Sequence, residues 1–112
     1  MPKQGDLVLI PVPFTDLTSQ KRRPVIVISN EAHHQLNGDV VVVAMTSNPT
    51  QTPYSFTLNS NDLVTGSLNR PGTVRVDKLY TLASSLIVKT FAQVNDATLN
   101  RVRALLMELM KS

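Results

Sequence analysis

The stretch Val40-Val41-Val42-Val43-Ala44-Met45 decides the fold class of this chain. Four consecutive β-branched residues favour a strand over a helix. A strand that is apolar without alternation is typical of the centre of a sheet, where both of its faces are buried. The turn residues Asn37-Gly38-Asp39 stand directly before it. We therefore predict a central strand over Val40–Met45, with the rest of a sheet built outward from it.

Further segments on both sides have the composition of short strands bounded by Pro, Gly or polar residues. They are Leu7–Val12, Pro24–Ser29, Tyr54–Leu58, Thr73–Asp77, Leu79–Leu82 and Leu86–Phe91. Pro11 and Pro13 place the end of the first strand at or near a sheet edge, because Pro cannot donate to the ladder, and Pro24 can open the second strand. The polar stretches Thr15–Lys21 and Asn48–Pro53 are predicted to be loops.

The end of the chain has the pattern of a helix. Asn95 suits the N-cap, and Asp96 in the first turn suits the helix dipole. Apolar residues then recur at spacings of three and four, at Leu99, Val102, Leu106 and Leu109. Packing of this stripe against a core is its ordinary explanation. Many short strands with one closing helix predict a β-rich α+β fold, built on a small, strongly bent sheet or barrel.

The composition predicts one domain over residues 1–112, since a chain with 42% hydrophobic and 17% charged residues is not disordered. It has no cysteine, which excludes disulfides, zinc–thiolate sites, iron–sulfur clusters and thiol nucleophiles. Eleven Lys and Arg against eight Asp and Glu give 11 − 8 = +3, which hints at an acidic partner such as nucleic acid. The apolar stretch Leu7–Phe14 is too short to span a membrane and lacks the features of a signal peptide. We expect a soluble, cytoplasmic protein.

Common catalytic motifs are absent: there is no Gly-rich phosphate loop, no His-Glu-x-x-His and no Gly-x-Ser-x-Gly. His33 and His34 are the only histidines, and a tandem pair could serve acid–base chemistry or bind a metal. They follow the second strand and precede a turn, so we expect them on or beside an exposed loop. Neighbouring positions of an extended chain face opposite ways, so we expect no shared ligand and no metal site.

Basic residues gather at Lys21-Arg22-Arg23, where a loop meets a strand. They could form a solvated edge that blunts aggregation, or they could bind phosphate through the rigid donor fork of Arg. Thr46-Ser47-Asn48 brings hydroxyls and an amide to the point where the central strand ends. Such a position often carries binding groups, although local backbone bonds in a turn are the plainer alternative.

Arg75 and Asp77 lie in the alternating segment Thr73–Asp77. On a strand, these two side chains and Thr73 share one face, and Val74 and Val76 face the core. Arg75 and Asp77 are then about 7 Å apart along the strand, a span that a substrate phosphate and its attacking hydroxyl could bridge. An exposed charge pair of little energetic weight is the alternative.

Four segments in this order resemble the MazF/PemK-like family of toxin endoribonucleases from bacterial toxin–antitoxin modules. They are Gly5-Asp6-Leu7-Val8-Leu9-Ile10, Arg23-Pro24-Val25-Ile26-Val27-Ile28, Val40–Ala44 followed by Thr46-Ser47, and Val74-Arg75-Val76-Asp77 followed by Thr81-Leu82. The resemblance covers nearly the whole chain, including the closing helix. It implies an SH3-like small β-barrel with a C-terminal helix, assembled as a homodimer. It also implies metal-independent, sequence-selective cleavage of single-stranded RNA without a cofactor, a cognate antitoxin protein as partner, and contact with operator DNA only through the antitoxin complex.

Carried over by residue, the family's catalytic Arg falls on Arg23 and its active-site Thr on Thr46, while the Arg and Asp of some relatives fall on Arg75 and Asp77. In the expected reaction the ribose 2′-hydroxyl attacks the adjacent phosphorus, with Asp77 as the base. The two Arg side chains would stabilise the phosphoryl oxygens, and Thr46 would donate a hydrogen bond to the phosphate. Further RNA contacts are expected from Lys21, Arg22, Ser47, Asn48, Tyr54 and Phe56; packing is the alternative for the two aromatic residues.

Other functions use the same fold. Gyrase-poisoning toxins share the barrel but act through a C-terminal Trp-Gly-Ile, whereas this chain ends Met110-Lys111-Ser112 and has no Trp. A non-catalytic SH3-like module that binds nucleic acid or protein would keep the basic edge without needing Arg75 and Asp77 on one face. An inactive relative of the ribonucleases is a third alternative.

Overall fold

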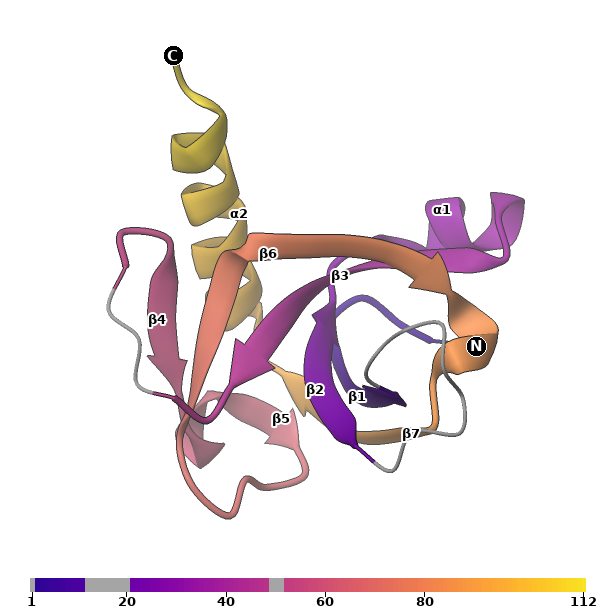
Figure 1. The fold of residues 1–112 in the computed structure, drawn as a ribbon, viewed down its shortest axis with the longest axis horizontal. Coiled ribbons are helices and arrows are strands. Elements are labelled where there is room, and N and C mark those ends of the chain that lie inside the picture. Colours follow the sequence, from indigo (N-terminus) through magenta and orange to yellow (C-terminus); the bar gives the residue numbers. More distant parts are fainter. Residues whose placement is uncertain (1, 12–20, 49–51) are drawn as a thin grey trace.

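The computed structural model describes residues 2–11, 21–48 and 52–112. They form a seven-stranded antiparallel sheet with the order β4-β6-β3-β2-β1-β7-β5, followed by a long helix (Figure 1). The strands are β1 (Asp6–Pro11), β2 (Arg22–Val27), β3 (Asp39–Thr46), β4 (Ser55–Leu58), β5 (Leu63–Thr65), β6 (Gly72–Ala83) and β7 (Lys89–Val94). The helices are α1 (Glu31–Leu36) and α2 (Asp96–Met110), and the 3-10 turns are η1 (Ser60–Asp62) and η2 (Ser84–Leu86).

The four valines lie inside the sheet as predicted. β3 pairs with β2 on one side and with β6 on the other. Val40, Val42 and Val43 are fully buried, and Val41 is half-buried. The sheet curls into a half-barrel, and α2 stands against it (Figure 1). This architecture confirms the β-rich α+β class with a closing C-terminal helix.

Two apolar clusters lie on opposite faces of the curled sheet, because successive residues of a strand point to opposite sides. Leu7 of β1 belongs to the cluster that packs against α2, where Leu99 and Val102 are buried. Val8, the next residue of β1, belongs to the second cluster. Its other buried members are Ile10, Val25, Val27, Val40, Val42 and Leu82. The face of the sheet that carries this second cluster also carries the candidate site.

β6 is a single strand of twelve residues, where two shorter strands were predicted. Its register against β3 shifts within one step, since Ala44 pairs with Arg75 and the preceding Val43 pairs with Leu79. Residues 76–78 therefore have no partner on β3 and form a bulge. Such a bulge bends a strand and increases its twist, so one strand serves two parts of the half-barrel.

Two other boundaries differ from the prediction. β7 begins at Lys89, because Ser84–Leu86 forms η2 ahead of it, and the segment that contains both histidines is the helix α1. The loop predicted at Thr15–Lys21 lies outside the described residues except for Lys21, as does the end of the first predicted strand at Val12.

The last turns of α2 leave the body of the molecule (Figure 1). Asn95 caps the helix as predicted, accepting a hydrogen bond from the Thr98 N–H at 2.9 Å. Leu99 and Val102 are buried, but Leu109 is 38% exposed and Met110 78% exposed. The apolar stripe therefore packs from Leu99 to Leu106, and the last turn of the helix is exposed. Among the described residues no helix combines the length and apolar character needed to cross a membrane.

Candidate nucleic-acid interface

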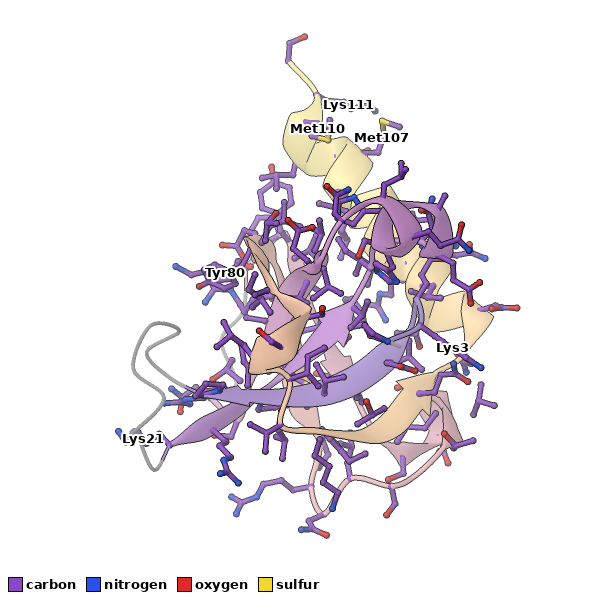
Figure 2. All side chains as sticks on the ribbon, turned by 90° about the vertical axis from the view of Figure 1, so that its right-hand side faces the viewer. Lys3, Lys21, Tyr80, Met107, Met110 and Lys111 are labelled. Carbon is purple, nitrogen blue, oxygen red and sulfur yellow. The ribbon has the colours of Figure 1, made fainter. Side chains whose placement is uncertain are left out.

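Two adjoining hollows, of about 390 and 300 Å³, form one groove at the ends of β2 and β3. Arg23, Pro24, Met45 and Thr46 line both, and we call the combined feature the basic groove. The first hollow is completed by Lys21, Arg22, Ser47, Arg70, Pro71 and Gly72. The second is completed by Val25, Ala44, Asn48, Arg75, Lys78 and Tyr80. Figure 2 shows Lys21 and Tyr80 toward the same side of the molecule, with Lys3 on the other side.

Strand register brings three of the predicted site residues to one face of the sheet. Val25 pairs with Ala44, and Ala44 pairs in turn with Arg75. Cross-strand partners share a face, and so do alternate residues of one strand. Arg23 stands two residues before Val25, and Thr46 two residues after Ala44. Arg23, Thr46 and Arg75 therefore share a face, although they are far apart in sequence.

The basic groove concentrates positive charge. Six of the chain's eleven Lys and Arg residues line it, and its described lining includes no Asp or Glu. They are Lys21, Arg22, Arg23, Arg70, Arg75 and Lys78. Where both partners belong to the described ranges, ion pairs form only at His33, Arg75 and Lys111. Arg22, Arg23, Arg70 and Lys78 are exposed and form none of these pairs, so their charge is available to a polyanion.

Thr46 makes the local backbone hydrogen bond weighed for it and also lines the basic groove. Its Oγ1 accepts a hydrogen bond from the Asn48 N–H at 3.2 Å, as in a local turn. An oxygen that accepts in this way still carries its own proton, which it can donate into the groove. Ser47 and Asn48 are both exposed, and each lines one of the two hollows.

Arg75 and Asp77 form a bidentate ion pair. Arg75 Nε donates to Asp77 Oδ1 at 2.9 Å, and Nη2 donates to Oδ2 at 2.8 Å. The hydrogen bond to Arg75 holds the pKa of Asp77 below its ordinary value, and the same bond raises the pKa of Arg75. The two side chains are therefore in direct contact, although their positions on the strand are two residues apart. Arg75 lines the basic groove, whereas Asp77 does not.

The two aromatic candidates lie outside the basic groove. Phe56 is 6% exposed within the cluster under α2, and the Arg101 guanidinium lies 4.6 Å from the centre of its ring. Its faces are therefore covered, and it is a core residue. Tyr54 is half-buried directly before β4 and lines neither hollow. The groove instead contains Tyr80, which sequence reasoning missed because its face depends on the bulge in β6.

The expectation that the histidines lie on an exposed loop is wrong. Asn30 caps α1 by accepting from the His33 N–H at 2.9 Å, a start signal that sequence reasoning passed over. His34 is 6% exposed, and its ring nitrogens lie 2.6 Å from Ser29 Oγ and 3.0 Å from the Pro2 carbonyl oxygen. His33 Nε2 lies 2.7 Å from Asp39 Oδ1. Both imidazoles thus have structural partners far from the groove.

Potential metal ligands are scattered in the part of the chain that the structure describes. No three His, Cys, Asp or Glu side chains there come close enough together to hold a metal ion.

Sequence comparison identifies the family. A family model for PemK-like, MazF-like toxins of type II toxin–antitoxin systems matches residues 3–110. The chain belongs to this family. No match is found among curated proteins.

Solved MazF structures share the fold. The chain is similar to the MazE–MazF complex of Deinococcus radiodurans, with 27% identity over 97% of this chain and 95% of that one and a TM-score of 0.78. It is also similar to an endoribonuclease from Mycobacterial species in complex with its cognate antitoxin (21% identity, 96% and 93% covered, TM-score 0.78). The Mycobacterium tuberculosis toxin MazF-mt6 matches with 14% identity, 92% and 93% covered, and a TM-score of 0.73. These likenesses confirm the barrel-like fold that the sequence resemblance implied.

Proposed function

We propose that this chain is an endoribonuclease toxin that cuts single-stranded RNA at a preferred sequence, and that its basic groove binds the RNA backbone. The observation that carries the proposal is the convergence of Arg23, Thr46 and Arg75 on one face, in a groove lined by cations. A solved structure with this fold, from Mycobacterial species, is an endoribonuclease in complex with its cognate antitoxin, which supports the same activity here. The proposed setting is the cytoplasm, and the proposed reaction uses neither a metal ion nor a cofactor.

The chemistry is an internal transesterification. The ribose 2′-oxygen bonds to phosphorus, the bond from phosphorus to the 5′-oxygen breaks, and the products are a 2′,3′-cyclic phosphate and a 5′-hydroxyl. Negative charge grows on the phosphoryl oxygens during this step, so preorganised donors accelerate it. Arg23 is exposed and forms no ion pair among the described residues, so its fork is free to bind two of these oxygens. The Thr46 hydroxyl donates a hydrogen bond to the same phosphate.

Arg75 and Asp77 act together in this proposal. The carboxylate of Asp77 accepts both bonds of the Arg75 fork, and its lowered pKa keeps it ionised near neutral pH. An incoming phosphate competes with Asp77 for the guanidinium. When Arg75 turns to the phosphate, Asp77 gains a free oxygen that can take the proton of the 2′-hydroxyl. The leaving 5′-oxygen takes up a proton from water and departs as a hydroxyl, and Asp77 returns the proton of the 2′-hydroxyl to the solvent.

The proposed partners follow from the same charge. An acidic segment of the cognate antitoxin would complement the basic groove and exclude RNA from it. The proposed assembly is a homodimer, which reaches operator DNA only through the antitoxin. Light scattering at micromolar concentration should give about twice the 12.3 kDa chain mass, and a monomer would contradict the dimer.

The test is single-turnover cleavage of a long single-stranded RNA of mixed sequence in EDTA, so that no recognition sequence need be known. Arg23→Ala should lower the cleavage rate about 100- to 1000-fold, because one preorganised donor is lost, and should weaken RNA binding much less. Arg23→Lys should restore only part of the rate, since a point charge cannot fork onto two oxygens.

The control is Arg103→Ala, which removes the same charge from α2, where Arg103 bonds to Asn100 and Gln4. It should cut at the wild-type rate. Cleavage that is lost in EDTA and restored by Mg²⁺ would contradict the mechanism. Binding of RNA without any cutting would instead favour the non-catalytic nucleic-acid-binding module.

A further inference from the structure

We infer that the basic groove continues into a site that reads a base of the RNA beside the cut phosphate; this inference rests on the proposed endoribonuclease function. A third hollow of about 280 Å³ shares Arg70 and Pro71 with the basic groove. The rest of its lining is amide, hydroxyl and apolar: Asn59, Ser60, Asn61, Leu68 and Asn69. We call this third hollow the amide pocket. RNA that enters it from the basic groove passes Arg70.

The walls of the amide pocket are fixed to each other. Ser60 Oγ donates to the Leu68 carbonyl at 3.3 Å and accepts from the Leu68 N–H at 3.0 Å, so the loop between β5 and β6 is held against η1. The Asp62 carbonyl accepts from the Asn95 N–H at 2.8 Å, which joins η1 to the start of α2. Recognition groups on a preformed wall lose little freedom when a ligand binds.

Two amide side chains of this pocket are unengaged. Asn61 and Asn69 are exposed, and neither side chain forms a hydrogen bond with the residues that the structure describes. An amide offers an acceptor oxygen and an NH₂ donor side by side, the pattern that pairs with the edge of a nucleobase. Single-stranded RNA exposes these edges, and proteins read its sequence there.

The basic groove and the amide pocket differ in the side chains that line them, which suits one to phosphates and the other to bases. Guanidinium and ammonium groups line the basic groove, and they suit phosphates, which are the same at every nucleotide. The amide pocket has Arg70 as its single cation, and it offers neutral groups beyond it. Phosphate contacts position a nucleic acid, whereas base contacts specify its sequence. The amide pocket is therefore the place where sequence preference enters.

The test compares cut sites of the wild type, Asn61→Ala, Asn69→Ala and the double variant on one RNA of mixed sequence, mapped by sequencing the new 5′ ends. The preference for one base at a fixed distance from the cut should fall about tenfold in the double variant, since a good amide–base pair discriminates to this degree. Asn100→Ala, on α2, is the matched control and should keep the wild-type preference. Circular dichroism verifies the fold of each variant.

The outcomes separate the two proposals. Wild-type cutting with the same base preference in the double variant overturns the amide pocket alone. Wild-type cutting with no preference at any position overturns both the amide pocket and the preferred sequence of the proposed function, and leaves only the RNA cleavage. A wild type that leaves RNA intact overturns the proposed function, and the base-reading site falls with it.

Discussion

Arg23 and Arg75 line one groove, yet their guanidinium groups are in different states. Arg23 is exposed and forms no ion pair with the described residues. Arg75 donates two hydrogen bonds to Asp77. The Arg23 fork is thus open to a phosphate, whereas Arg75 can present its Nε and Nη2 donors as a fork only in exchange for Asp77. The two residues are expected to act in that order.

The ion pair at Asp77 should make stability depend on pH. Because the folded state lowers the pKa of this carboxyl, the stabilisation is present above the pKa of the unfolded chain, near about 3.9, and is lost as pH falls through the folded value. Asp77→Asn should therefore lower the free energy of unfolding at pH 7, and the difference from the wild type should fade below about pH 4. Urea unfolding across this pH range measures it. A difference that grows toward acid would contradict the assignment.

His34 should matter for stability and not for the reaction. The Pro2 carbonyl can only accept, so Nδ1 of His34 donates to it, and Ser29 Oγ lies 2.6 Å from Nε2. His34→Ala leaves these groups without their partner and should cost about 1–3 kcal/mol of unfolding free energy. Its cleavage rate per folded molecule should match the wild type, as should that of His33→Ala. A collapse in rate with normal stability would place a histidine in the active site.

At the level of residues, the sequence predicts groups better than their contacts. It places Arg75 on a strand, and it places Arg23 and Thr46 at the ends of two other predicted strands. Their convergence comes from the register of β2, β3 and β6, which the sequence does not give. It does not place Tyr80, whose face depends on how many residues the β6 bulge inserts. The sequence also does not show which way Phe56 faces. An aromatic residue next to a candidate loop has the same local sequence whether its side chain enters the groove or the core.

At the level of elements, β-branched composition and turn residues suffice to find most strands, and an N-cap suffices to begin α2. The continuity of β6 was not predictable in this way. Its bulge satisfies a long-range pairing in which Val43 and Ala44 meet residues four positions apart on β6. α1 was missed because six residues are too few for a helical period to show.

The turn after β5 depends on a glycine. Gly66 has φ +81, and a Cβ there would lie 2.5 Å from the Phe91 carbonyl oxygen and 2.7 Å from Ala92 Cβ. Gly66→Ala should therefore lower the unfolding free energy by more than about 1 kcal/mol, because the backbone angle is strained and atoms must move. Gly38→Ala is the matched control, since a Cβ there meets nothing within 4 Å, and it should be close to neutral. Equal effects in urea unfolding would contradict this account.

On the scale of the whole molecule, the net charge of +3 understates the asymmetry of the surface. Six of the eleven basic side chains stand around one groove, so the local field is far stronger than the total suggests. Composition alone gives only the small total. The six basic side chains come together because of the register of β2, β3 and β6 and because the segment before β6 brings Arg70 to the groove.

This asymmetry predicts a steep response of RNA binding to salt. For single strands, the logarithm of the binding constant falls by about 0.7 per phosphate contact against the logarithm of salt concentration. Arg70→Ala should reduce the wild-type slope by about 0.7 if Arg70 holds one phosphate. Fluorescence anisotropy with a short RNA in a salt series measures the slopes, and Arg103→Ala should leave the slope unchanged. An unchanged slope for Arg70→Ala would remove this residue from the RNA path.

The exchange proposed at Arg75 predicts a link between RNA binding and proton uptake. Once its guanidinium turns to a phosphate, Asp77 loses the partner that keeps its pKa low and stands instead beside a polyanion. Its affinity for a proton then rises in the complex, so the complex binds more protons than the free protein at mildly acidic pH. RNA should consequently bind more tightly as the medium is acidified toward the carboxyl range. The heat of binding should then vary with the ionisation enthalpy of the buffer, and in Asp77→Asn it should not.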